Sequence, residues 1–287
     1  MTTKNWGLGA GIAIFLLMLL VGPPASMGAP AWHVAALTLL MAIWWMTEAF
    51  PLTVTALLPF LALPLMGILS AGDVAKEYYS PILFLILGGA FIALTVERTG
   101  MHRRIALWIL GFAGQSRFGL LLAFMAATAF ISMWISNTST ALIMMPIALA
   151  VLVAGGVSED DTDGMAGALV LGVAFAASMG GLGTLVGSPT NPIAVGLIEK
   201  QVGMNISFAD WSSFGIPILL VAVPMAALVL AKVQKIEATA FDPKAARSAI
   251  GRQGAWTTAE KRLLPVILLA IVLWLAQPQL ETMLPKG

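Results

Sequence analysis

Long runs of apolar residues, separated by short polar segments, divide the chain into a series of predicted helices. Many of these runs approach the roughly 20 residues that a helix needs to cross a bilayer. Prolines or charged residues lie at many of their ends, and proline cannot continue a helix. The predicted membrane spans are residues 6–21, 31–47, 52–69, 81–96, 213–231 and 263–276. Residues 70–80 are expected to form a polar loop. Residues 105–113 are too short to span and basic at both ends, a pattern typical of a helix lying in the interface.

Two further stretches, residues 118–156 and 165–198, contain no charged residue but are interrupted in the middle. The first interruption is a run of small polar side chains at 136–140. The second, residues 180–192, is rich in glycine and contains two prolines. As one straight helix the second stretch would be about 51 Å long, whereas the hydrocarbon core is about 30 Å thick. It therefore forms either two full spans or one broken crossing.

The distribution of Lys and Arg helps to choose between these topologies, because basic loops stay on the cytoplasmic side. With the N-terminus inside, four spans return the chain to the inside at the basic residues 98–117. A single broken crossing over 165–198 then places the basic segment 232–262 inside as well. This favours one crossing, unwound near 187–192. For 118–156, two full spans and a re-entrant hairpin both satisfy the rule; the short arms and small uncharged turn favour the hairpin.

Composition supports an all-α, polytopic membrane protein and excludes several functions. Hydrophobic residues make up 59% of the chain and charged residues only 10%, with a mean hydropathy of +0.94. Cysteine is absent, the two histidines are isolated, and neither interrupted stretch contains His, Asp or Glu. We therefore expect no enzymatic activity and no cofactor. The net charge of +1 gives no indication of nucleic-acid binding.

The two interruptions are candidates for one binding site. Irregular backbone at membrane depth is tolerated only where it is buried in protein or lines a cavity. Hydroxyl and amide side chains can donate to a carboxylate or accept a cation. Since neither stretch contains Lys or Arg, the charge of a bound anion must be offset by helix N-termini and co-bound cations. Cation-coupled anion uptake follows naturally. The polar cluster could instead be a helix cap or a contact between helices, and Gly183 and Gly187 a close-packing motif.

These residues carry a resemblance to a known family. The sequence around Ser136-Asn137-Thr138, together with Gly187-Ser188-Pro189-Thr190-Asn191, resembles the divalent anion:sodium symporters, which transport di- and tricarboxylates. Residues 47–59 and 84–91 support it. The resemblance implies two inverted repeats, each with a re-entrant hairpin and a broken helix. It also implies a homodimer in the cell (inner) membrane, with a scaffold domain and a transport domain that moves as an elevator.

The resemblance also assigns roles to single residues. Sodium, the coupling ion, is expected at residues of both motifs: Ser132, Ser136, Asn137 and Gly187. The substrate is expected to contact the hairpin tip, with two residues of the second motif nearby: Ser136, Asn137, Thr138, Ser188 and Pro189.

The implied organisation follows the order of the predicted elements. Residues 1–117 would be scaffold spans and the interfacial helix. Residues 118–212 would be the transport elements, with the hairpin at 118–156 and the broken helix at 165–198. Residues 213–262 would be a sixth span and a basic cytoplasmic linker, with residues 232–262 expected to be solvated. Residues 263–287 would begin a second repeat, whose hairpin and broken helix the sequence lacks; the sequence thus corresponds to the first part of a transporter.

The expected function is sodium-coupled uptake of dicarboxylates or tricarboxylates, such as succinate, malate or citrate. The alternatives are a sodium-independent carboxylate exchanger, a sodium:sulfate symporter, and, in a different class, a membrane scaffold or fragment that does not transport.

Overall fold

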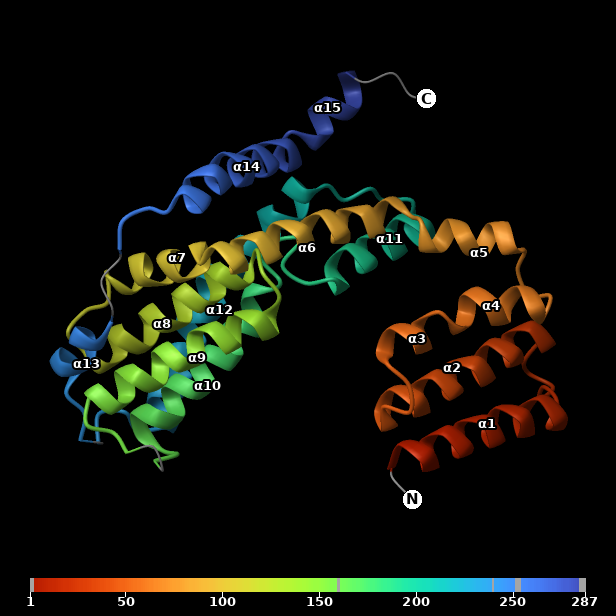
Figure 1. Cartoon of the computed structure of the whole chain (residues 1–287), viewed down its shortest axis with the longest axis horizontal. Coiled ribbons are helices and arrows are strands. Elements are labelled where there is room, and N and C mark those ends of the chain that lie inside the picture. Colours follow the sequence, from red (N-terminus) through yellow and green to blue (C-terminus); the bar gives the residue numbers. More distant parts are fainter. Residues whose placement is uncertain (1–2, 159–160, 239, 251–253, 284–287) are drawn as a thin grey trace. The chain divides into compact units, whose positions relative to one another are not determined.

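The computed structural model of the chain describes residues 3–158, 161–238, 240–250 and 254–283. Within these residues every regular element is a helix, so the predicted all-α class is confirmed (Figure 1). The chain divides into a smaller unit, Met1–Leu83, and a larger unit, Phe84–Gly287.

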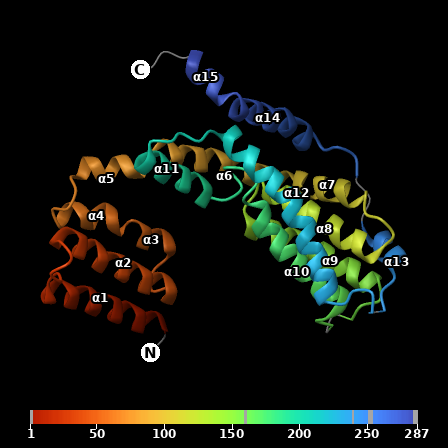
Figure 2. The same cartoon turned by 180° about the vertical axis from the view of Figure 1, so that it is seen from behind.

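The smaller unit is built on two helices that lie side by side, α1 and α2 (Figures 1 and 2). Its helices are α1 (Thr3–Val21), α2 (Ala29–Thr47), α3 (Leu52–Ala56), α4 (Leu58–Leu65) and α5 (Ala71–Tyr78). Glycines allow the close approach of the first pair. A side chain at Gly7 would collide with Thr47, and one at Gly11 with Trp44. Small residues at such contacts are typical of helix packing in membranes.

Two predictions for this unit need correction. The expected third span, residues 52–69, is divided into α3 and α4 and ends at Leu65. Pro59 at the start of α4 and Pro64 inside it explain the short helices, because proline removes a backbone donor and crowds the preceding turn. The expected loop, residues 70–80, contains helix α5 instead. Its N-cap is Ser70, whose hydroxyl accepts a hydrogen bond of 3.1 Å from the Asp73 backbone N–H.

The larger unit has a core of four packed helices, α8, α9, α10 and α12 (Figures 1 and 2). The helices assigned to it begin with α6, whose first three residues precede the unit boundary. They are α6 (Pro81–Thr99), α7 (Met101–Leu110), α8 (Arg117–Ser132), α9 (Asn137–Ala154), α10 (Gly164–Gly180), α11 (Thr190–Val202), α12 (Phe208–Val233), α13 (Pro243–Ala249), α14 (Thr258–Leu275) and α15 (Gln277–Met283). Fully buried side chains from three of the packed helices fill the core: Leu120, Leu121, Phe124, Met125, Met144, Val151, Met165, Leu169 and Val173.

The basic segment that follows α12 is folded onto this core. We expected residues 232–262 to be a solvated linker, but Ile236, Phe241 and Ala246 are buried. Phe241 packs on Gly155 at the end of α9. A side chain added at Gly155 would overlap the Phe241 ring. Arg247 donates to the carbonyl oxygen of Gly111 at 2.8 Å. The prediction was wrong here because a charged segment can still bury the apolar side chains between its charges.

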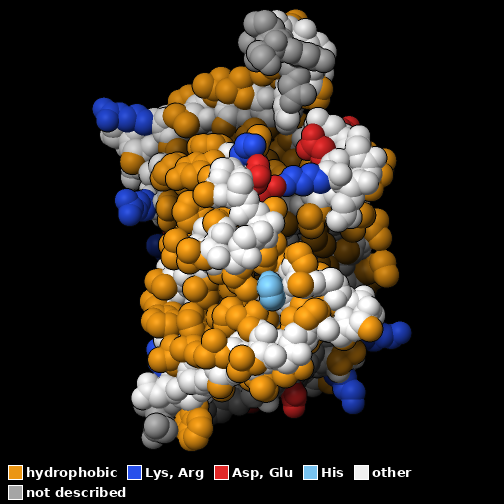
Figure 3. All heavy atoms as spheres, turned by 90° about the vertical axis from the view of Figure 1, so that its right-hand side faces the viewer, with side chains coloured by type: hydrophobic (Ala, Val, Ile, Leu, Met, Phe, Trp, Pro, Cys, Tyr) orange, Lys and Arg blue, Asp and Glu red, His pale blue; other side chains and the backbone are white. Residues whose placement is uncertain are grey.

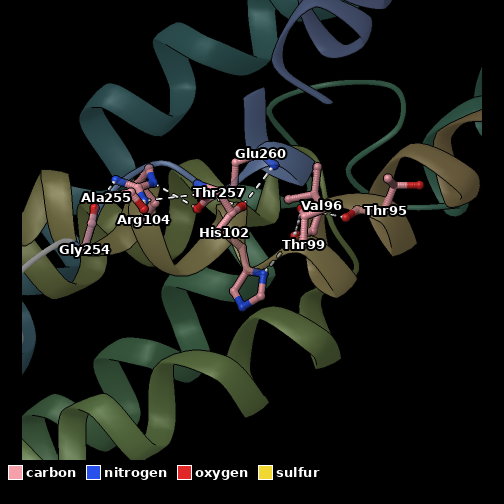
Figure 4. A network of polar contacts seen from close by, with 9 residues as sticks. All are labelled: Thr95, Val96, Thr99, His102, Arg104, Gly254, Ala255, Thr257 and Glu260. Atoms are coloured by element: carbon pink, nitrogen blue, oxygen red, sulfur yellow. Dashed lines mark hydrogen bonds and ion pairs between the residues drawn. The ribbon is translucent and has the colours of Figure 1, made fainter. Parts of the chain in front are cut away.

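A network centred on Arg104 joins α7 to the start of α14 (Figure 4). The Arg104 guanidinium donates to Glu260 Oε1 at 2.9 Å and Oε2 at 3.2 Å, and both side chains are largely buried. It also donates to the carbonyl oxygens of Gly254 and Ala255, each at 3.0 Å. The Arg104 hydrogen bonds, followed by the Thr257 backbone N–H, lower the pKa of Glu260 to about 2. Glu260 precedes the apolar part of α14, so this network lies outside the membrane-spanning residues.

Several helices have the length and composition of membrane spans. Among the described residues they are Thr3–Val21, Ala29–Thr47, Ala71–Thr99, Asn137–Ala154 and Phe208–Val233. The face of the molecule in Figure 3 is covered mainly by hydrophobic side chains, with charged side chains in a few places. Exposed apolar helices of this length are stable only in a lipid environment. The chain is therefore a multi-pass membrane protein.

Candidate functional site

The first interruption forms the tip of a helical hairpin. Helix α8 ends at Ser132 and helix α9 begins at Asn137. Ser136 is the N-cap of α9, and its hydroxyl accepts a hydrogen bond of 3.2 Å from the Ser139 backbone N–H. The buried Ser132 hydroxyl lies 2.8 Å from Asn137 Oδ1 and 2.7 Å from the Ala177 carbonyl oxygen of α10. The tip is thus held both across its own turn and against the neighbouring helix.

The second interruption is an unwound segment between α10 and α11, residues 181–189. We expected unwinding near 187–192, but the helix already ends at Gly180, and Thr190 to Pro192 form the first turn of α11. Asn191 explains how the segment is held. Its side-chain amide is buried and donates to the carbonyl oxygens of Gly181 at 2.7 Å and Thr184 at 2.8 Å. These bonds replace the helical partners that the unwound backbone has lost.

The hairpin tip and the unwound segment meet at Gly187. A side chain on Gly187 would lie 2.8 Å from the Gly181 carbonyl oxygen, 3.0 Å from that of Met133 and 3.1 Å from that of Ser132. Carbonyl oxygens from the ends of α8 and α10 therefore converge on the space that glycine leaves open. Oxygen atoms in such an arrangement suit a hard cation. Together with Ser132 Oγ and Asn137 Oδ1 of the same turn, these carbonyl groups form a set of oxygen donors whose chemistry fits a sodium ion.

A cavity of about 270 Å³ adjoins this point. Helix α6 forms one wall, with residues between Leu85 and Glu97, and the hairpin tip contributes Ser136 and Ser139. The unwound segment and the start of α11 complete it with residues 185–189 and Pro192. The N-termini of α9 and α11 therefore both border the cavity. Helix N-termini present unpaired N–H groups and a partial positive charge, which favour an anion.

The residues expected from the sequence occupy different places around this site. Ser136, Ser188 and Pro189 line the cavity, as does Gly187. Asn137 lies beside Ser132 and Gly181, away from the cavity lining. Thr138 is exposed and does not line the cavity.

Sequence reasoning missed the residues that hold the site together. Thr184 and Asn191 are almost completely buried and hydrogen bond to the backbone of the two interruptions. Asn191 belongs to the motif at residues 187–191, but its position in the sequence did not indicate a role for its side chain. The wall contributed by α6 was also missed, although the Gly88-Gly89 pair was a signal. A side chain at Gly89 would lie 3.1 Å from Val186, which shows that α6 closely approaches the unwound segment.

Comparison with known proteins identifies the family of the chain. Residues 42–285 match the family model described as citrate transporter, CitMHS. The chain belongs to the citrate transporter family. The sodium-dependent dicarboxylate transporter SdcS of Staphylococcus saprophyticus subsp. saprophyticus is 36% identical over 280 residues, which cover 94% of this chain and 54% of the relative. SdcS proteins of Staphylococcus aureus strains USA300 and NCTC 8325 are 37% identical over the same coverage.

Membership in this family confirms the resemblance to divalent anion:sodium symporters that the two motifs indicated. The chain spans about half the length of the curated relatives it matches. The region that matches the family model, residues 42–285, begins within α2 and includes α15. It therefore contains both interruptions.

Proposed function

We propose that this protein is a secondary active transporter that couples sodium entry to the uptake of a dicarboxylate or tricarboxylate. The observation that carries the proposal is the meeting of four helix ends. The carbonyl ends of α8 and α10 converge at Gly187, while the N-termini of α9 and α11 border the adjacent cavity. The names of the relatives, sodium-dependent dicarboxylate transporters, support the same substrates.

Electrostatics explains why the two ligands would be coupled. No Lys or Arg lines the cavity among the described residues, and Glu97 contributes a carboxylate. A dianion in the cavity therefore needs compensation from the two helix N-termini and from sodium beside it. Sodium bound among the carbonyl oxygens would raise the affinity for the anion, and by linkage the anion would raise the affinity for sodium.

Under this proposal each expected site residue has a task. Ser132, Asn137 and the backbone of Gly187 would hold sodium, and Ser136 would lie between sodium and substrate. Thr138, Ser188 and Pro189 would contact the substrate or shape its surroundings. Sodium would be the coupling ion, and the protein would need no other cofactor and catalyse no reaction. We further propose that residues 118–212 form the transport elements. We also propose that the protein is a homodimer in the inner membrane, with its N-terminus in the cytoplasm.

The test measures uptake of labelled succinate into proteoliposomes with sodium or choline outside. Ser136→Gly removes the hydroxyl but retains most of the N-cap stability, since glycine costs only a few tenths of a kcal/mol there. Asn137→Ala removes the amide. Ser178→Ala is the control, because the exposed Ser178 hydroxyl donates only to Ala174 in its own helix. We expect the first two variants to lose sodium-dependent uptake and the control to retain it.

Other outcomes identify the alternatives. Exchange that is equally fast in sodium-free vesicles would refute sodium coupling and indicate a carboxylate exchanger. Uptake of sulfate in place of succinate would refute the substrate class. A protein that neither sodium nor succinate stabilises against thermal unfolding would have no such binding site, since a ligand at 100 times its Kd stabilises by about 2.7 kcal/mol. That result would favour a membrane scaffold.

A further inference from the structure

Thr184 connects the second interruption, to which it belongs, to the first. It lies in the unwound segment and is only 1% exposed. Its hydroxyl donates a hydrogen bond to the Met133 carbonyl oxygen in the hairpin turn. The same hydroxyl accepts a hydrogen bond of 3.1 Å from the Gly187 backbone N–H, which also donates to the Thr184 carbonyl oxygen at 3.3 Å. One side chain therefore connects the hairpin tip to the glycine at which the carbonyl oxygens converge.

One of these contacts is to a carbonyl oxygen of the proposed sodium site, and the other is to the backbone N–H of Gly187, the glycine at its centre. Met133 contributes one of the three carbonyl oxygens near Gly187, and the Gly187 N–H fixes the orientation of that glycine. Asn191 restrains the other side, because its amide holds the carbonyl oxygens of Gly181 and Thr184. Thr184 does not line the cavity. It therefore acts on the site through the backbone that it holds.

We propose that Thr184 is a positioning residue that sets the geometry of the sodium site by joining the hairpin turn to the unwound segment. This inference rests on the proposed function. Without the hydroxyl, the Met133 carbonyl oxygen loses its link to the unwound segment, and the Gly187 N–H keeps only its longer bond of 3.3 Å to the Thr184 carbonyl oxygen. The carbonyl oxygens would then converge less closely, and sodium would bind more weakly. Partners that orient ion-binding groups typically change ion affinity by roughly 10-fold to 100-fold when they are removed.

The chain offers a matched control for this idea. Thr128 is completely buried in α8, and its hydroxyl donates to the Phe124 carbonyl oxygen of the same helix at 2.7 Å. Thr128→Val and Thr184→Val remove the same hydroxyl from equally buried positions. Only the second removes a bond between the two interruptions. Thr184→Ser retains the hydroxyl and tests whether the hydroxyl is the cause.

The experiment uses the 287-residue chain in lipid nanodiscs and has two readouts. The first is hydrogen exchange at the Gly187 amide, measured in choline chloride without sodium. The second is the sodium concentration that gives half of the maximal thermal stabilisation. We expect Thr184→Val to accelerate exchange at Gly187 and to raise the sodium midpoint by roughly tenfold or more. We expect Thr184→Ser and Thr128→Val to resemble the wild-type protein in both readouts.

Several results would overturn the proposal. Thr184→Val with wild-type exchange and midpoint would do so, and so would Thr184→Ser behaving like Thr184→Val. If Thr184→Val does not fold, the wild-type protein still decides: a Gly187 amide that exchanges as fast as an unprotected amide contradicts the bond. If sodium does not stabilise the wild-type protein, the proposed sodium site is refuted. The exchange data would then still show, independently, whether Thr184 joins the two segments.

Discussion

Replacing Gly187 with alanine tests the convergence of carbonyl oxygens most directly. The added methyl group would lie 2.8 Å from the Gly181 oxygen, 3.0 Å from the Met133 oxygen and 3.1 Å from the Ser132 oxygen. All three neighbours are backbone atoms, so no flexible side chain can move aside. Forcing extra volume into such a packed site costs about 1–3 kcal/mol. We therefore expect Gly187→Ala to lower the free energy of unfolding by about that amount.

The effect on sodium should be larger than the effect on stability. The methyl group would push the carbonyl oxygens apart, so under the proposed function sodium would lose several ligands at once. We expect Gly187→Ala to abolish the stabilisation that sodium gives to the wild-type protein. The assay follows unfolding in nanodiscs by denaturant titration, with sodium chloride or choline chloride at equal ionic strength.

Gly88→Ala provides the control, since no atom lies within 4 Å of the position that its methyl group would take. Gly88 lies in helix α6, where alanine is favoured over glycine by up to about 1 kcal/mol. The two substitutions should therefore change stability in opposite directions. Gly187→Ala with unchanged stability would refute the packing argument. Reduced stability with an unchanged response to sodium would mean that the ion binds elsewhere.

Two further predictions concern the contacts that hold the basic segment. Arg104→Gln should lower the thermal stability at pH 7, because it removes the partner of the ionised Glu260. The part of the wild-type advantage that comes from Glu260 should be present above about pH 4.5 and be lost as the pH falls towards about 2, since the folded-state pKa of Glu260 lies below its unfolded value. The part that comes from the Gly254 and Ala255 carbonyl oxygens should remain. An advantage that already falls at pH 6 would contradict this. Gly155→Ala should displace the Phe241 ring and increase tryptic cleavage of the segment after α12, whereas Gly9→Ala, with open space around it, should not.

Local signals in the sequence were sufficient to predict both interruptions. The hairpin turn follows from small polar side chains in an uncharged run, and Ser136 caps α9 as its residue type favours. The unwound segment follows from its glycines and prolines. The prediction placed the unwinding too late because it relied on Pro189 and Pro192, whereas proline is well tolerated in the first turn of a helix, where α11 uses Pro192.

Contacts between distant residues could not be predicted in the same way. Arg104 and Glu260 are separated by 156 positions, and Thr184 and the Met133 carbonyl group by 51. Neither Thr184 nor Asn191 has an unusual neighbourhood in the sequence. Their importance arises from which backbone groups they reach after folding. The missed helix α5 is a different case, because Ser70 and Asp73 are a local capping signal that the sequence did contain.

The position of the Ser136-Asn137 pair explains how binding of the two ligands could be coupled without any large movement. Ser136 caps the helix end that borders the cavity, and the next residue, Asn137, directs its Oδ1 towards Ser132 beside the carbonyl oxygens. Under the proposed function, adjacent residues of one turn would thus serve the anion side and the cation side. An ion that fixes Asn137 also restricts Ser136, so part of the entropy lost on ordering the turn is shared by both ligands. Coupling of this kind is reciprocal, and it requires only that the turn be less ordered when both ligands are absent. Hydrogen exchange at residues 133–139 should then slow with sodium alone, slow with succinate alone, and slow least on addition of the second ligand.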